Sequence, residues 1–203
     1  MTTVKPKTRI PKQKRSIDKK NRVMEAAISL FAKKGIHKTN SKEIAAEAGV
    51  AIGSFYSYFP DKKKLLTEVL EIYLENHFDR IWYQNTNWEA LSPLQIIRHF
   101  MKNLLLAYDV APDFHRETHV LRYSDPEVKL LYDKETEKEL RQIGAALDFF
   151  KDQIQVKDME AAAVVIHSAA ENFAHKIKFM GSLDDKRLMD EFTDMIYRYL
   201  FKE

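Results

Sequence analysis

The chain has 203 residues, no cysteine, and a formal net charge of +3 from 33 Lys/Arg and 30 Asp/Glu. The lack of cysteine excludes disulfides, thiolate catalysis and cysteine metal sites, no apolar run is long enough to cross a membrane, and no apolar signal segment follows the charged N-terminus. We therefore expect a cytoplasmic protein that is not inserted in a membrane.

The composition predicts the fold class, and the distribution of charge suggests a partner. Only 5 glycines and 6 prolines interrupt the sequence, and no strand-length alternation of β-branched residues is visible, so we expect an all-α fold of about nine helices. Residues 1–64 carry a net charge of +11 and residues 65–203 a net charge of −8. A basic head on an acidic body favours nucleic acid as a partner of the head, although a solvated tail would explain the charge equally well.

The N-terminal stretch and the first helix are distinguished by periodicity. Residues 1–17 contain prolines and many cations without apolar periodicity, which predicts a disordered basic arm. Such an arm either follows a DNA backbone or minor groove, or serves only as a solubilising tail. A helix is then predicted over 18–34, ended by Gly35. Its apolar stripe consists of Val23, Ala26, Ala27, Leu30 and Phe31.

The stretch 40–59, NSKEIAAEAGVAIGSFYSYF, is typical of two short helices joined by a tight turn. Asn40 and Glu43 have the spacing of a capping box at the start of the first helix. Gly49 supplies the left-handed residue that ends it. The second helix starts at Ala51 and carries an apolar face. We therefore predict a helix-turn-helix, whose second helix is shaped to enter a DNA major groove.

Together with the preceding helix, this stretch resembles the DNA-binding head of the TetR family of bacterial transcriptional regulators. The resemblance covers about residues 20–70 and rests on AAISLFAKKGIHKTNSKEIAAEAGVAIGSFYSYFPDKKKLL. Two positions depart from the family pattern. Ala51 stands where a serine often caps the recognition helix, and Ile52 where a lysine or polar residue is frequent. We expect a weaker cap at the first and an apolar contact at the second, such as one to a thymine methyl group.

The resemblance and side-chain chemistry together indicate which residues contact DNA. Hydroxyl and amide groups can bond bases or phosphates, Gly53 would let the backbone approach a phosphate, and Lys62 follows a helix start that favours phosphate. The predicted DNA-contacting residues are Thr39, Asn40, Ile52, Gly53, Ser54, Tyr56, Ser57 and Lys62. Core packing is expected instead for Phe55, Tyr58 and Phe59.

Apolar periodicity and capping residues predict the helices of a body beyond the head. A helix is expected over 62–82, a loop over 84–88, and further helices from Pro93, from Pro112, over 126–151, over 159–180, and from Asp185 to the C-terminus. The charged run DKETEKELRQ, residues 133–142, is expected to be largely solvent-facing. The predicted domains are the arm 1–17, the DNA-binding domain 18–64, and a ligand-binding and dimerisation domain 65–203.

The resemblance implies a small-molecule pocket in the body, and aromatic, flexible apolar and isolated polar residues suit its lining. These candidates are Phe100, Met101, Leu104, Tyr108, Phe114, His119, Tyr123, Phe149, His167, Asn172 and Phe173. The alternative for each is a structural role, which is the more common one for the apolar residues as core and at least as common for the polar residues as satisfied hydrogen-bonding groups. Their character favours a hydrophobic or aromatic ligand. His115 and His119 have the spacing for one metal ion, but no third ligand is placed, so we expect no metal and no cofactor.

The helix predicted over 159–180 has apolar or small residues on two faces, which indicates two partners, and the last helix carries one apolar face. A four-helix bundle with a second copy of the chain satisfies both faces and looks like the family's dimer interface. An internal core helix is the alternative. We expect a homodimer because helix-turn-helix proteins commonly bind two half-sites.

These observations favour a transcriptional repressor that a small ligand releases from a palindromic DNA operator. A DNA-bound adaptor or architectural protein without an inducer is the alternative. An enzyme is not expected, because the sequence contains no Gly-rich phosphate loop, no HExxH and no GxSxG.

Overall fold

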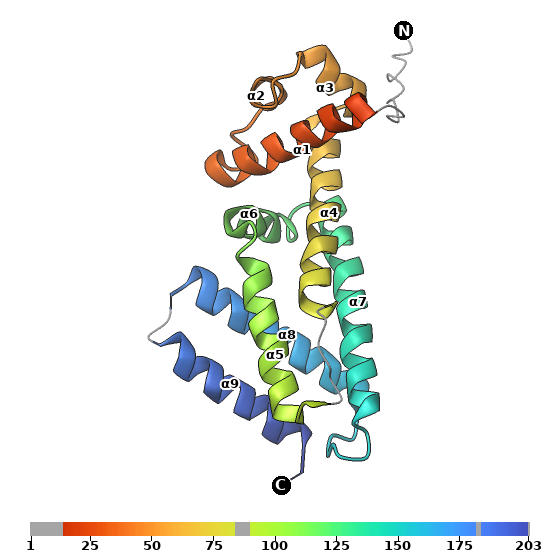
Figure 1. The fold of residues 1–203 in the computed structure, drawn as a ribbon, viewed down its shortest axis with the longest axis vertical. Coiled ribbons are helices and arrows are strands. Elements are labelled where there is room, and N and C mark those ends of the chain that lie inside the picture. Colours follow the sequence, from red (N-terminus) through yellow and green to blue (C-terminus); the bar gives the residue numbers. More distant parts are fainter. Residues whose placement is uncertain (1–13, 84–89, 182–183, 203) are drawn as a thin grey trace. The chain divides into compact units, whose positions relative to one another are not determined.

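A computed structural model of the chain describes residues 14–83, 90–181 and 184–202. Within these ranges the chain is all-α, as predicted, and one isolated bridge joins Ile154 to Phe201 (Figure 1). The helices are α1 (Lys14–Lys34), α2 (Ser41–Glu47), α3 (Ile52–Tyr58), α4 (Lys62–Trp82), α5 (Pro93–Tyr108), α6 (Pro112–Leu121), α7 (Pro126–Phe149), α8 (Met159–Phe179) and α9 (Asp185–Leu200). None of the described helices is both long enough and apolar enough to cross a membrane.

The helices gather into two compact units, each built from two separate parts of the chain. Unit 1 comprises residues up to 73 together with 111–131, and unit 2 comprises 74–110 and 132–203. Both α4 and α7 begin in unit 1 and end in unit 2. The boundary therefore passes through the middle of two continuous helices.

Unit 1 forms around the apolar stripe of α1, which packs against α2, α3 and α6. Phe31 of α1 is fully buried and stacks on Phe114 of α6, with 6.3 Å between ring centroids. The backbone N–H of Ile36 donates to the carboxylate of Glu117 at 3.4 Å. Helix α6, which falls inside the predicted body range, thus contributes to the core of the helix-turn-helix unit.

Unit 2 is organised around α5, which packs against α8 and α9 (Figure 1). Phe173 of α8 and Phe192 of α9 stack with ring centroids 4.1 Å apart. Local capping defines where these helices begin. Ser92 and Gln95 form a capping box at α5, and Asp158 accepts from the N–H of Ala161 at α8.

The structure corrects several expected boundaries. Helix α1 begins at Lys14 rather than at Asp18, and Ser16 in this added turn shares a 3.0 Å hydroxyl hydrogen bond with Tyr58. Helix α7 ends at Phe149 rather than at 151, and α8 ends at Phe179 rather than at 180. The predicted loop 84–88 and residues 1–13 of the arm lie outside the described residues.

The charged middle of α7 was predicted to face solvent, and this is wrong for two of its acids. Glu135 and Glu139 are only 6% and 7% exposed. They occupy the buried stripe of the helix because they continue its three- and four-residue spacing. That stripe consists of Val128, Tyr132, Glu135, Glu139, Ile143 and Leu147.

Candidate nucleic-acid interface

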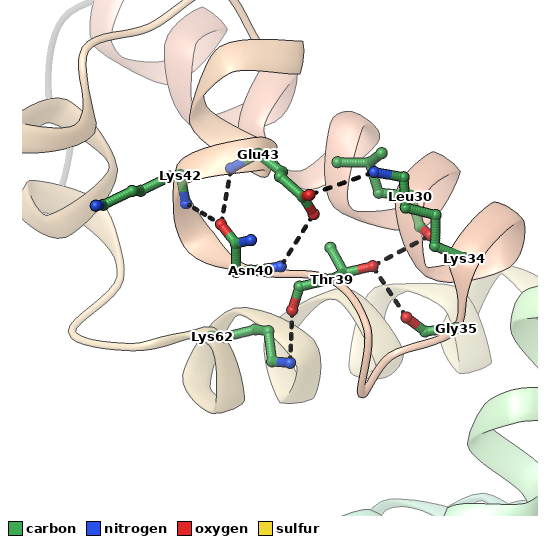
Figure 2. Close-up of polar contacts among 8 residues, drawn as sticks. All are labelled: Leu30, Lys34, Gly35, Thr39, Asn40, Lys42, Glu43 and Lys62. Atoms are coloured by element: carbon green, nitrogen blue, oxygen red, sulfur yellow. Dashed lines mark hydrogen bonds and ion pairs between the residues drawn. The ribbon is translucent and has the colours of Figure 1, made fainter.

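The first short helix of the motif is fixed by the predicted capping box. The side-chain oxygen Oδ1 of Asn40 accepts from the N–H groups of Lys42 and Glu43 at 3.0 and 3.1 Å. The N–H of Asn40 donates to Glu43 Oε2 at 3.4 Å, so both members of the box are bonded (Figure 2). The amide oxygen of Asn40, a predicted DNA contact, is therefore already used within the protein.

The turn after α2 has the geometry expected from its glycine. Gly49 has a φ of +62°, in the left-handed region that side chains with a Cβ rarely adopt. The N–H of Val50 then donates to the carbonyl of Ala45 at 2.9 Å, and that of Gly49 to Ala46 at 3.0 Å. These two bonds close the end of α2 and direct the chain into α3.

Helix α3 has one buried face and one exposed face. Phe55 on the helix and Phe59 just after it are fully buried, which confirms their predicted packing role. Ile52 and Tyr56 are 38% and 46% exposed, and Gly53 and Ser57 are exposed beside them. The structure thus brings four of the predicted DNA-contacting residues onto one surface, which we call the α3 face: Ile52, Gly53, Tyr56 and Ser57.

The two serine side chains of α3 are less available than the other candidates on this helix. Ser54 is half-buried. The hydroxyl of Ser57 donates to the carbonyl of Ser54 at 2.7 Å. Ala51 is the N-cap residue of α3 and makes no side-chain capping bond, as its missing hydroxyl predicts.

Thr39 and Lys62 bond to backbone carbonyls near the start of the motif (Figure 2). Thr39 is 1% exposed, and its hydroxyl donates to the carbonyls of Gly35 and Leu30 at 2.9 and 3.3 Å. The ammonium of Lys62 donates to the carbonyls of Ile36 and Thr39, both at 2.7 Å. Burial lowers the pKa of Lys62 from its ordinary value. Both side chains therefore fasten the loop that joins α1 to α2.

The predicted ligand-lining residues are divided between the two units. Phe114, His119 and Tyr123 belong to unit 1, and the others belong to unit 2. Met101, Leu104 and Tyr108 are buried on α5. Tyr123 and Phe149 are instead 80% and 71% exposed.

The polar candidates of α8 differ in their surroundings. Asn172 is exposed and donates to the carbonyl of Ser168 at 2.8 Å. His167 contacts Glu139 at 2.6 Å. The glutamate was missed because it lies within a charged run, and the regular spacing of the α7 stripe is the signal that could have found it.

Comparison with known proteins agrees with this geometry. Residues 23–69 match the family model of bacterial regulatory proteins of the tetR family. In these residues the chain is similar to the TetR family of bacterial regulatory proteins. The matched segment begins within α1, contains α2 and α3 and ends within α4.

Two curated relatives illustrate how the similarity is distributed along the chain. The helix-turn-helix regulator YuxN of Bacillus subtilis is 42% identical over 64 residues, covering 32% of this chain and 22% of its own. The repressor KstR2 of Mycolicibacterium smegmatis is 33% identical over 115 residues, covering 57% of this chain and 52% of its own. The chain therefore spans about half or less of the length of these relatives.

The fold is shared over nearly the whole chain. A solved structure from Mesorhizobium loti, described as a TetR-family transcriptional regulator, superposes with a TM-score of 0.77. The match covers 94% of this chain and 100% of the other at 20% identity. At this level of identity the likeness extends to architecture and no further.

Proposed function

We propose that this protein is a DNA-binding transcriptional repressor that reads an operator with the α3 face. The observation that carries the proposal is the exposure of Ile52, Gly53 and Tyr56 beside Phe55, which is buried at 0% exposure. A helix anchored from behind and carrying short or apolar side chains outward is suited to a major groove. The net charge of +11 over residues 1–64 supplies the attraction to phosphate.

The proposed protein acts as a homodimer on a palindromic site. Helices α8 and α9 carry apolar side chains that the single chain leaves open to solvent: Val164, Val165, Met195 and Tyr199 are 47%, 53%, 52% and 42% exposed. Apolar side chains exposed on neighbouring turns of a helix suit an interface. Pairing of two chains through α8 and α9 would present two copies of α3 to successive half-sites.

The proposed release mechanism uses a small hydrophobic or aromatic effector bound in unit 2. Helix α4 starts in unit 1 directly after the motif and continues as one helix into unit 2. An effector that prefers the unbound form of the protein would reduce operator affinity in proportion to that preference.

A mobility-shift measurement tests the proposal directly. The full-length protein is titrated onto DNA from upstream of its own gene and onto genomic fragments, at about 50 and about 200 mM salt. We expect a specific complex whose affinity falls steeply with salt, because basic side chains displace counterions from phosphates. Failure to shift any genomic fragment at moderate salt would refute the proposal.

Gly53→Ala tests whether α3 is the reading surface. A methyl group added at Gly53 meets no atom of the described chain within 4 Å, and alanine stabilises an exposed helix by up to about 1 kcal/mol relative to glycine. The variant should therefore fold normally but lose roughly tenfold or more in operator affinity through a clash with the DNA backbone, about 1.4 kcal/mol.

Gly144→Ala is the matched control, because Gly144 lies on α7 and also has open space around its Cβ position. It should bind DNA as the wild type does. If Gly53→Ala binds equally well, α3 is not the reading surface.

A panel of metabolites, read by melting temperature, addresses the effector. A specific ligand should raise the melting temperature of the protein and weaken the DNA complex. Stabilisation by no compound, together with intact operator binding, would favour an adaptor without an inducer.

A further inference from the structure

Unit 2 contains a group of ionisable side chains that DNA binding does not use. Glu139 of α7 and His167 of α8 contact each other, with 2.6 Å between Oε2 and Nε2. Glu171 lies one turn further along α8, and one ligand atom from each of the three residues lies within 4.8 Å of the others. The four-residue spacing places His167 and Glu171 on the same face of α8. Two helices thus bring three metal-ligating groups together.

Beside this group lies a buried carboxylate that is only partly satisfied. Glu135 precedes Glu139 by one turn on α7 and is 6% exposed. Its Oε2 pairs with Lys138 at 3.4 Å, while Oε1 has no hydrogen-bond partner among the described residues. A cation at this position would compensate both the lost hydration and the repulsion between the carboxylates.

Tyr108 gives the group outer support. It is fully buried on α5 and donates from its hydroxyl to Glu171 Oε1 at 3.1 Å. Carboxylates that bind metals are commonly held in this way by a second residue. His77 lies against the Tyr108 ring, and burial lowers the pKa of His77 to about 4. His77 is therefore neutral near pH 7 and does not offset the negative charge.

We propose that Glu139, His167 and Glu171 bind a divalent first-row transition-metal ion. Metal–nitrogen and metal–oxygen bonds of about 2.0–2.2 Å place neighbouring ligand atoms of a tetrahedral site about 3.4 Å apart. On metal binding, the 2.6 Å distance between His167 Nε2 and Glu139 Oε2 must therefore lengthen, and any ligand atoms farther apart than about 3.4 Å must approach one another. Rotation of the glutamate side chains allows both changes. One imidazole with carboxylates suits Zn²⁺, Mn²⁺ or Fe²⁺, whereas Mg²⁺ and Ca²⁺ prefer oxygen ligands alone.

Direct metal uptake tests the proposal on the full chain without an affinity tag. The protein is stripped with EDTA, dialysed, exposed to Zn²⁺ or Mn²⁺, and separated from free ion before its metal content is measured. We expect one ion per chain, a higher melting temperature with Zn²⁺ than with Mg²⁺, and visible absorption from Co²⁺ coordinated by nitrogen and oxygen. Because no DNA is present, failure here is independent of failure of the proposed repressor function.

Variants separate a metal site from a simple ion pair between Glu139 and protonated His167. His167→Ala and the nearly isosteric Glu139→Gln and Glu171→Gln should each weaken Zn²⁺ binding at least roughly tenfold, and Tyr108→Phe should weaken it less. Glu137→Gln, an exposed position on the same helix, is the control and should still bind one ion. Wild-type uptake well below one ion per chain, or equal uptake by wild type and the folded Gln variants, would overturn the proposal.

Discussion

One polar cluster in each unit shows a different pattern of bonding. In unit 1, the side chains of Thr39, Asn40 and Lys62 all bond to backbone groups at the start of the motif. In unit 2, Glu139 bonds to His167 and Tyr108 bonds to Glu171, so that side chains satisfy one another. Backbone bonding fixes the shape of a loop and leaves little to titrate. A network of acids and imidazoles instead holds charge that responds to protons and ions.

The largest expected effect is a loss of stability that distinguishes the buried face of α3 from its exposed face. Phe55→Ala removes a fully buried ring and should destabilise unit 1 by about 3–5 kcal/mol. Tyr56→Ala, at the next position, removes a ring that is 46% exposed and should cost no more than about 1 kcal/mol while weakening operator binding. Hydrogen exchange of the α2 and α3 amides measures the stability, and similar losses from both variants would contradict the assignment of faces.

The second effect tests whether unit 2 responds to pH through Glu135. Burial raises its pKa to about 7 from an ordinary value of 4.5, so the folded state holds a proton that the unfolded state has already released. Stability from this group is complete below about pH 4.5 and is lost as pH rises through 7. Glu135→Gln should abolish this loss. The free energy of unfolding of the variant relative to wild type should therefore rise by about 2 kcal/mol between pH 5 and pH 8.

Urea unfolding of wild type and Glu135→Gln at several pH values measures this difference in stability. EDTA is present to keep the protein free of metal. Glu137→Gln is the control, because Glu137 is exposed on the same helix and should not change the pH dependence. A parallel pH profile for wild type and Glu135→Gln would show that Glu135 is ionised normally.

A smaller effect on stability is expected at the start of α2, where the side chain of Asn40 bonds to backbone N–H groups. Asn40→Ala removes the acceptor for the N–H groups of Lys42 and Glu43 and should cost about 1 kcal/mol. This loss should be independent of pH between 6 and 9, in contrast to the behaviour of Glu135. Thermal unfolding across that range provides the measurement, and an unchanged melting temperature would exclude the cap as a source of stability.

The smallest effect is a gain at the uncapped start of α3. Ala51 makes no side-chain capping bond, so Ala51→Ser should stabilise the helix by about 0.5 kcal/mol or slightly more. The matched change Ala46→Ser, at an exposed position inside α2, should not stabilise the protein. Serine within a helix competes for the backbone hydrogen bonds of the helix. A melting temperature that rises for Ala46→Ser and not for Ala51→Ser would show that the cap is not the cause.

The contrast between the units also explains what the sequence could predict. The capping box at Asn40 and the turn at Gly49 are encoded by residues only a few positions apart, and both were predicted. The same holds for the apolar stripe of α1 and for the buried rings of Phe55 and Phe59. Because each of these patterns is local, elementary helix chemistry is enough to interpret it.

The features that sequence reasoning missed depend on distant partners. The Ile36–Glu117 bond that joins α6 to the motif spans 81 residues, and the Tyr108–Glu171 bond spans 63. No pattern among neighbouring residues predicts such contacts. Glu135 and Glu139 are an intermediate case, since their spacing matches the buried stripe but their charge pointed to solvent. Their burial follows the periodicity of the helix and not the usual exposure of their residue type.

The division of α4 and α7 between the units has a consequence for recombination. Unit 1 needs residues 111–131 as well as the first 73, because Phe114 stacks on Phe31 and Glu117 accepts from Ile36. A chimera that transplants only the N-terminal segment into a relative would therefore place α1 against a foreign α6. Exchange of unit 1 between relatives therefore requires two crossovers, so that α6 is transferred together with the N-terminal segment. Unit 1 can be exchanged only as two separate segments of the chain.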